Sequence, residues 1–161
     1  MTSHRLLFAA LFCLALPALA APTSRIQADK MELREAEGIT VFTGDVVYTQ
    51  REEAVTIHAD RITVHSKDNE LIRVEARGKP VRFSHLGGDK PVTGEARQLD
   101  YDGAAELVIL TGDAYVTSGS DRIQGARIEY DMINKQAQAS GGESEGRFEA
   151  VITPSSNETE Q

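Results

Sequence analysis

The chain of 161 residues carries 17 Lys and Arg against 25 Asp and Glu, a formal net charge of −8, and 40% hydrophobic residues. This length is typical of one domain that buries enough surface to fold without a metal or disulfide. The acidic balance disfavours a nucleic-acid partner, whose phosphates require a basic face, and disfavours adhesion to an anionic membrane by charge alone.

The first twenty residues have the composition of a secretory signal peptide. Arg5 gives a positive start, residues 6–16 are almost continuously apolar, and Ala18-Leu19-Ala20 is a small-x-small cleavage pattern. The apolar stretch is shorter than the ~20 residues that span a bilayer. We therefore expect a signal peptide at residues 1–20 and an exported chain beginning at Ala21, with an uncleaved N-terminal anchor as the alternative. Cys13, the only cysteine, would leave with the signal peptide.

Beyond the signal peptide, the hydrophobic pattern has a period of two. Apolar and polar residues alternate in segments rich in β-branched and aromatic residues, at 41–49, 80–84, 99–102, 114–117, 128–131 and 148–152. Clusters of Gly, Asp, Asn and Ser separate these segments. The sequence predicts an all-β domain of many short strands.

Two kinds of segment alternate along the chain and form an internal repeat. The first kind has apolar residues three and five places after a small residue, which is Ala28, Ala59, Ala96 or Gly125. The second kind centres on a glycine, which is Gly44, Gly78, Gly112 or Gly141. A step of three followed by a step of two indicates two short strands joined at a corner, with the apolar side chains kept inside. Such a unit cannot cover its own apolar face, so neighbouring units must stack and share one elongated core.

The order of these segments resembles the OstA-like domain of the LptA family, the periplasmic carriers of lipopolysaccharide in Gram-negative bacteria. The resemblance covers roughly residues 24–152 and is carried by FTGDVVYTQ at 42–50, GKPVRF at 78–83 and LVILTGDAYV at 107–116. It implies an open, twisted β-jellyroll of stacked antiparallel strand repeats, whose apolar groove holds the acyl chains of lipid A. The predicted cleavable signal fits the soluble bridge of this family, located in the periplasm between the inner and the outer membrane.

The resemblance also implies partners at both ends of the domain. Stacked open units leave an unpaired strand edge at each end, here expected at 24–33 and 147–153. Such edges add strands from similar domains through main-chain hydrogen bonds. The family pattern places an inner-membrane LptC-like protein at the N-terminal edge, an outer-membrane LptD-like protein at the C-terminal edge, and further copies head to tail. The predicted edge residues are Ile26, Ala28, Phe148, Ala150 and Ile152.

The lipid path is predicted from the pleat and from the resemblance. Insoluble acyl chains require an apolar surface shielded from water, which inward-facing strand positions supply. Family positions that line the path carry over to Ile26, Phe83 and Tyr101, whereas Ser24 and Gly103 depart from the family's apolar pattern. Ordinary core packing is the alternative role for each inward residue. The predicted lipid-binding residues are Ile26, Phe42, Val46, Tyr48, Phe83, Leu99, Tyr101 and Val116.

Charge and composition also indicate where the sugar heads lie and where the domain begins and ends. The net acidic charge repels phosphorylated sugar heads, so we expect these heads to lie outside in water. Residues 21–152 would form the domain, and the polar, acidic residues 153–161 a disordered tail.

No residue pattern predicts catalysis, a cofactor or a metal site. His58 and His65 would face opposite sides of a flat strand, and no Cys or His spacing typical of a metal site accompanies them. Asp45 and Asp113 form a conceivable carboxylate pair for glycoside hydrolysis, but turn chemistry after glycine explains their repetition more simply. We expect no enzyme activity. An exported carbohydrate-active enzyme or carbohydrate-binding module of stacked β repeats is the alternative function.

Overall fold

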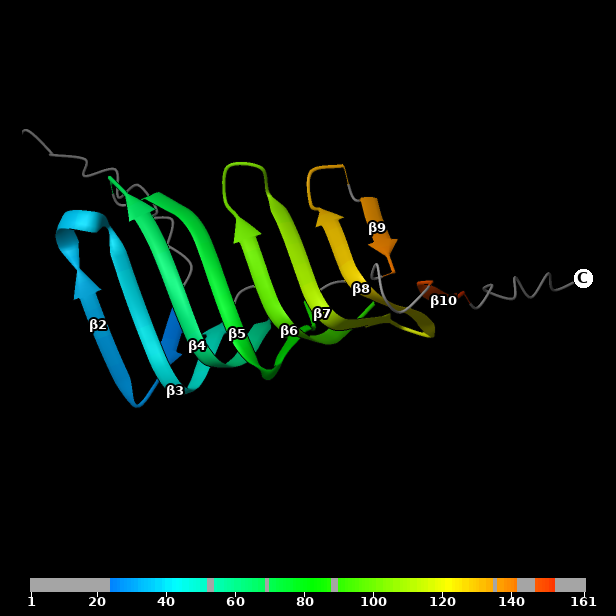
Figure 1. Cartoon of the computed structure of the whole chain (residues 1–161), viewed down its shortest axis with the longest axis horizontal. Helices are drawn as coiled ribbons and strands as arrows, with labels where there is room; N and C mark the ends of the chain where they lie inside the picture. The colour runs from blue at the N-terminus through cyan, green and yellow to red at the C-terminus, as the bar shows by residue number, and fades with distance from the viewer. Residues whose placement is uncertain are drawn as a thin grey trace, which may run out of the picture.

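The computed structural model describes residues 24–51, 54–68, 70–87, 90–134, 136–141 and 147–152. The predicted signal peptide at 1–20 and the predicted tail at 153–161 lie outside the described residues. The elements, shown in Figure 1, are β1 (Ser24–Gln27), β2 (Lys30–Arg34), a 3-10 turn η1 (Glu35–Glu37), β3 (Ile39–Gln50), β4 (Val55–Lys67), β5 (Glu70–His85), β6 (Val92–Asp102), β7 (Leu107–Ser118), β8 (Asp121–Asp131), β9 (Gln136–Ser140) and β10 (Glu149–Val151).

The ten strands of the described residues belong to one antiparallel sheet. Its order is β1-β3-β4-β5-β6-β7-β8-β10, while β2 also pairs with β3 and β9 also pairs with β8. From β3 to β8, each strand therefore pairs with the next strand in the sequence, as expected where short connections join antiparallel neighbours. The first and last strands of this order are not paired with each other, so the sheet remains open. The predicted all-β class is confirmed.

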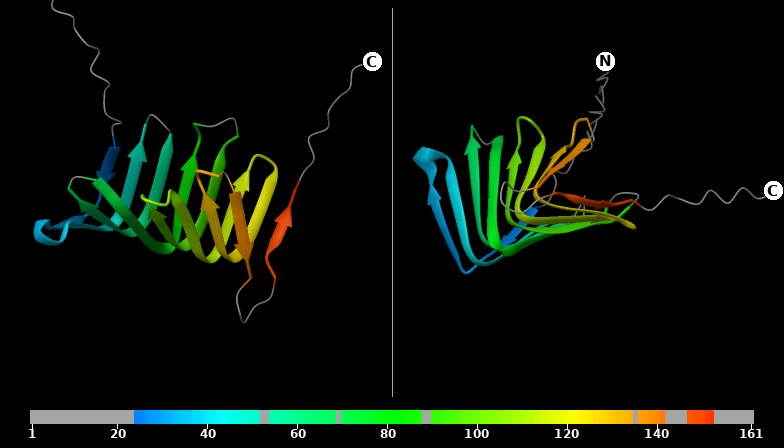
Figure 2. Two further views of the ribbon diagram at one scale, coloured as in Figure 1. Left: turned by 90° about the horizontal axis from the view of Figure 1, so that it is seen from above. Right: turned by 45° about the vertical axis from the view of Figure 1, so that its right-hand side comes forward.

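The long strands bend near their middle, and the bend divides the sheet into two limbs. Figure 2 shows the V-shaped section that results. We call the limb with β2 and β9 the front limb, because it faces the viewer in Figure 1, and the limb with β1 and β10 the rear limb. We call the open side, where the limbs end, the mouth. Strand pairing shifts in register at the bend along every pair from β3–β4 to β7–β8.

The repeated Thr-Gly-Asp segments form two of these bends. Gly44 and Gly112 have φ angles of +86° and +82°, and the aspartates that follow, Asp45 and Asp113, have φ angles of +40° and +49°. Glycine adopts this left-handed conformation without penalty, and aspartate tolerates it better than most residues. The segments are thus bulges inside continuous strands, not turns between strands. The predicted corner is present, but β3 to β8 run through it as single strands.

Within the described residues, separate half-strands occur only at the two ends of the sheet. β1 pairs with the rear-limb half of β3 and β2 with its front-limb half. At the other end, β9 pairs with the front-limb half of β8 and β10 with its rear-limb half. The N-terminal edge matches the expected residues 24–33. The C-terminal edge contains β9 in addition to the expected segment near β10.

Candidate functional site: the inner face of the bent sheet

Apolar side chains cross the front limb in a continuous row. Each member lies directly opposite the next on the neighbouring strand, and side chains at paired positions share one face of a sheet. We call this the front row; it consists of Met31, Phe42, Ile62, Ala76, Leu99, Leu110, Ile128 and Ala139. No member is polar. The row therefore gives the front limb an apolar inner surface along its whole length.

A second row crosses the rear limb in the same way. We call this the rear row; it consists of Ile26, Tyr48, Ile57, Phe83, Gly94, Val116, Ile123 and Ala150. The phenol of Tyr48 lies 3.1 Å from the Ser24 hydroxyl, which gives its polar end a partner near the mouth. The two rows face each other across the inside of the V. Together they form the apolar inner face of the sheet.

Burial on the inner face decreases from the bend towards the mouth. Ile62 and Leu110, near the bend, are 2% and 3% exposed, whereas Val64 and Val108, two residues farther along the same strands, are only partly buried. Among the described residues, no polar or charged side chain belongs to the buried set. The bend is thus an ordinary hydrophobic core. The part nearer the mouth is an apolar surface that remains open to a ligand.

The predicted lipid-binding residues all lie on this inner face. Val46 and Leu99, at 0% and 5% exposure, lie in the buried core at the bend, where they support the sheet. Tyr101 lies opposite Val74 and Val108 and is partly buried. The others are partly buried and pack against the core, namely Ile26, Phe42, Tyr48, Phe83 and Val116.

Sequence reasoning missed several equivalent positions. Val74, Val108 and Ile123 also pack against the core from the inner face. The alternation of these residues with polar residues is visible in the sequence, but only the pairing register shows that they continue the apolar inner face. Tyr130 lies opposite Val108 on the same face and is 41% exposed near the mouth.

The two positions that depart from the family pattern have local structural roles. Ser24 begins β1 and contacts Tyr48 as described above. Gly103 lies in the turn between β6 and β7, where its N–H donates a 2.8 Å hydrogen bond to the carbonyl oxygen of Ile72. A β-carbon on Gly103 would stand 2.6 Å from the carbonyl oxygen of Leu71. This close approach of two backbones requires glycine.

The histidines and aspartates considered for catalysis or metal binding lie apart. His58 pairs with Val47 and Arg82, and His65 with Ile39 and Arg73. The expectation that these histidines face opposite sides was wrong, because the bulge between them changes the parity of β4 and puts both on the outer face. His65 Nε2 lies 4.0 Å from Glu75. Among the described residues, no three His, Cys, Asp or Glu side chains cluster as a metal site would require.

Asp45 and Asp113 do not form a catalytic pair. Both are exposed at the bend, on β3 and β7, with β4, β5 and β6 between them. Four strand spacings of ~4.8 Å separate them by roughly 19 Å. Paired carboxylates of glycosidases stand at most about 9.5 Å apart. The Asp113 carboxylate instead accepts a hydrogen bond from the guanidinium of Arg97.

The bent antiparallel sheet, open along one side and lined with apolar rows, defines the protein class as an open β-jellyroll with an apolar inner face. Within the part of the chain that the structure describes, no helix is long and apolar enough to cross a membrane. Residues 25–136 match the family model described as LptA/(LptD N-terminal domain) LPS transport protein. The chain belongs to this family, as its sequence pattern indicated.

Characterised relatives agree with this assignment. The chain is 31% identical over 133 residues to the lipopolysaccharide export system protein LptA of Escherichia coli K12, covering 81% of this chain and 70% of that protein. It is 32% identical over 134 residues to LptA of Haemophilus influenzae, covering 81% and 76%. It is 30% identical over 150 residues to the lipopolysaccharide export system protein LptH of Pseudomonas aeruginosa, covering 88% and 85%.

A solved structure confirms the fold. The crystal structure of LptH from Pseudomonas aeruginosa, described as the LptA-homologous periplasmic component of a lipopolysaccharide transport device, superposes with a TM-score of 0.73. The two share 24% identity, and the match covers 83% of this chain and 96% of that chain. The predicted open β-jellyroll is confirmed.

Proposed function

We propose that this protein is a periplasmic lipopolysaccharide-binding bridge, which carries the acyl chains of lipid A on its inner face from the inner to the outer membrane. The observation that carries the proposal is the pair of apolar rows, which run the length of an open sheet and become accessible towards the mouth. The characterised relatives named above are lipopolysaccharide export proteins. The proposed role is transport without catalysis.

The geometry suits an amphiphile with several long chains. Each methylene group removed from water contributes ~0.8 kcal/mol, so acyl chains lying between the two rows gain free energy along their length. Because the sheet is open, the chains can enter from the side and do not need to thread through an end. The sugar heads would remain at the mouth, in water. This arrangement requires no polar group to be buried with the chains.

Head-to-tail assembly is supported by the polarity of the end strands. Neighbouring strands of the sheet run in opposite directions. β1 and β2 lie together at one end of the sheet, and β9 and β10 lie together at the other. Because the order contains eight strands of alternating direction, the first strand and the last strand run antiparallel to each other. They therefore have the relative direction that neighbours in an antiparallel sheet need. A second copy placed beyond β9 and β10 can therefore continue the sheet without a change in pattern.

The same extension keeps both apolar rows continuous. In the front row, Ala139 of one copy would lie opposite Met31 of the next; in the rear row, Ala150 would lie opposite Ile26. Met31 and Phe148 are 62% and 52% exposed in the isolated chain, and the junction would cover them. We propose that an LptC-like protein uses the N-terminal edge and an LptD-like protein the C-terminal edge in this way.

Photo-crosslinking in cells tests the lipid path. A photoreactive amino acid at Phe83 should give an adduct with lipopolysaccharide, because Phe83 lies in the accessible part of the rear row. The matched control is Arg82, the preceding residue, which is exposed on the outer face of the same strand. Adducts from Phe83 alone support the proposal. Equal adducts from both positions, or adducts from Arg82 alone, would contradict it.

A further inference from the structure

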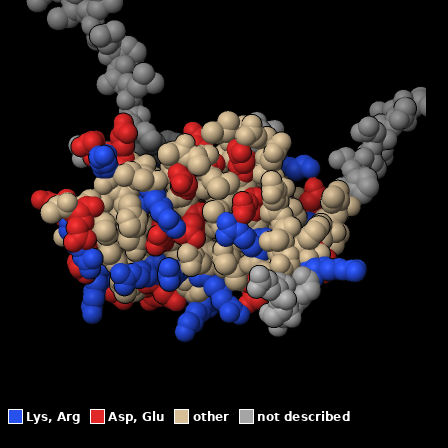
Figure 3. All heavy atoms as spheres, turned by 45° about the horizontal axis from the view of Figure 1, so that its top comes forward, with Lys and Arg blue, Asp and Glu red and all other residues tan. Residues whose placement is uncertain are grey.

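The outer face of the front limb separates its charges into two rows. We call the row nearer the bend the cationic row, because it contains four cations and no carboxylate. It consists of Lys30, Thr43, Arg61, Arg77, Gln98, Thr111, Arg127 and Ser140. We call the next row the acidic row, because it contains four carboxylates and no cation. It consists of Glu32, Val41, Thr63, Glu75, Asp100, Ile109, Glu129 and Gln138. In Figure 3, Lys and Arg gather along the lower margin of the molecule.

Every carboxylate of the acidic row already has a cationic partner. Glu32 accepts a 2.7 Å hydrogen bond from Arg34, and Glu129 a 2.6 Å hydrogen bond from Arg127. Arg73 lies 3.1 Å from both Glu75 and Asp100. The hydrogen bond to Asp100 and the charge of Glu75 raise the pKa of Arg73. The acidic row therefore has no unpaired carboxylate that could neutralise the other cations of the cationic row.

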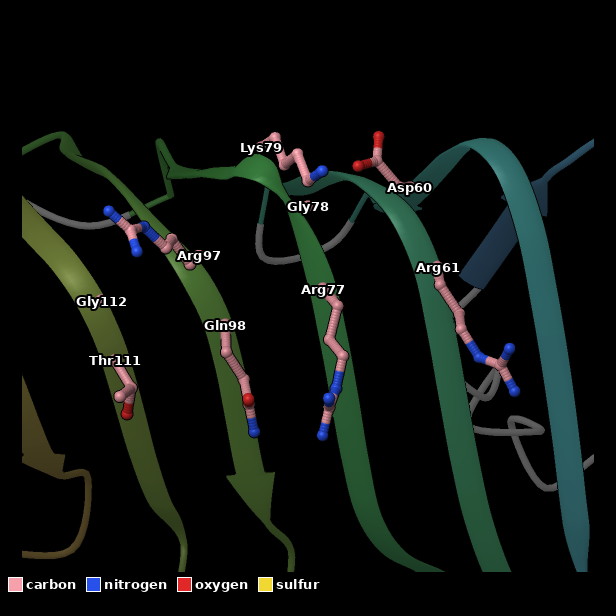
Figure 4. A pocket seen from close by; sticks show the side chains of 9 residues that line it. All are labelled: Asp60, Arg61, Arg77, Gly78, Lys79, Arg97, Gln98, Thr111 and Gly112. Carbon is pink, nitrogen blue, oxygen red and sulfur yellow. The ribbon is translucent and has the colours of Figure 1, made fainter.

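Arg61 and Arg77 are left with like charges opposite each other. They are direct partners across β4 and β5, and both are exposed. Within the described ranges of the chain, neither forms an ion pair. Like charges directly opposite each other destabilise a sheet. In Figure 4 the Arg77 side chain runs down beside β5, and the Arg61 side chain extends from β4 on the side away from Arg77.

A hollow of about 400 Å³ surrounds this pair on the outside of the bend. Its lining includes Lys79 and Arg97, so it presents four cations against the single carboxylate of Asp60 (Figure 4). Arg97 is paired with Asp113. Lys79 forms no ion pair in the described part of the chain, although its amino group points towards Asp60 in Figure 4. Arg61, Arg77 and Lys79 therefore outnumber the one carboxylate of the hollow by three to one. The local charge is positive although the whole chain has a net charge of −8.

We propose that Arg61, Arg77 and Lys79 form a binding site for a phosphate group. The guanidinium fork matches phosphate oxygens in pairs, and a dianion between two neighbouring strands neutralises both arginines at once. The site lies on the opposite face of the sheet from the apolar rows. It is therefore independent of the proposed lipid path, and either proposal can fail without the other.

Thermal unfolding with glucosamine 1-phosphate as the probe tests the site. Ligand that binds only the folded protein raises its midpoint temperature. We expect a rise relative to sodium chloride of equal ionic strength, and no rise with glucosamine, which lacks the phosphate. Arg61→Gln and Arg77→Gln should each weaken the apparent affinity about tenfold, because each removes charge-assisted hydrogen bonds. Each should also raise the midpoint without ligand, because the repulsion between the two arginines is removed.

Arg127→Gln is the matched control, since Arg127 lies in the same row but is neutralised by Glu129. It should leave the response to glucosamine 1-phosphate unchanged. Inorganic phosphate distinguishes the source of the group: a weaker response than to glucosamine 1-phosphate assigns the site to a phosphate ester, and an equal response assigns it to free phosphate. An equal rise in sodium chloride, or an undiminished response in Arg77→Gln, overturns the site itself.

Discussion

The ring of Phe83 lies over Gly94, its direct partner on β6. A β-carbon on Gly94 would stand 2.7 Å from two atoms of this ring and 2.4 Å from the carbonyl oxygen of Tyr115. Gly94 is the member of the rear row that lacks a side chain, and the neighbouring aromatic ring fills its place, a known way of stabilising glycine in a sheet. The inner face thus remains continuous where the sequence alone suggests a gap.

Gly94→Ala should destabilise the protein by about 1–3 kcal/mol, because the added methyl group overpacks this contact. Part of the cost comes from the ring of Phe83 and part from the backbone of Tyr115. In the double variant with Phe83→Ala, the two effects should therefore be less than additive. Denaturant unfolding of the two single variants and the double variant measures this coupling. Strict additivity would show that the ring does not pack on Gly94.

Aspartate substitutions should separate the buried core from the accessible inner face. At Leu110, 3% exposed, a carboxylate would be buried without a partner and should prevent folding. At Phe83 or Tyr101, which are partly buried, the carboxylate can reach water, so the fold should persist while lipopolysaccharide binding falls. Circular dichroism and the lipopolysaccharide that copurifies provide the two readouts. Unfolding of the Phe83 and Tyr101 variants as well would place these residues in a closed core.

A disulfide pair tests the proposed junction between copies. Met31→Cys and Ala139→Cys, combined in a Cys13→Ser background, should give disulfide-linked ladders on oxidation, because the continued front row places them opposite each other. The matched control replaces Gln138 instead of Ala139. Gln138 is the next residue along β9, so its side chain points to the other face. Ladders of equal yield from the control pair would exclude the proposed register.

The bend was predictable because its requirements are local. A small residue or a glycine marks it in each repeat, and these residue types are readable without knowledge of strand pairing. β9 was missed because Gln136–Ser140 contains only alanines as apolar residues, which give a weak strand signal. The face of His65 and the two charge rows were not predictable. Both depend on the parity change at each bulge and on which residues lie opposite each other.

Acid should loosen the turn between β8 and β9. The backbone N–H of Asn134 donates a 2.8 Å hydrogen bond to the carboxylate of Asp131, and this bond, with the Asn134 side chain, lowers the pKa of Asp131. A lowered pKa stabilises the folded state above the ordinary value for Asp, and this contribution is lost as the pH falls through the lowered value. The midpoint of wild type should therefore fall more steeply with acid than that of Asp131→Ala. Parallel pH profiles would contradict this role.

Removal of residues 147–161 should shorten head-to-tail assemblies without unfolding the domain. β10 contributes three paired residues, Glu149–Val151, on the rear-limb half of β8, whereas β9 covers the front-limb half with five. The truncated chain therefore keeps its core and the front half of the C-terminal edge, but it loses the rear half and the exposed Phe148. Light scattering should show a folded protein with shorter rods at the same concentration. A longer deletion from residue 136 should reduce assembly further, because it removes β9 as well. Rods of undiminished length after the first deletion would show that the rear half of the edge does not take part in the junction.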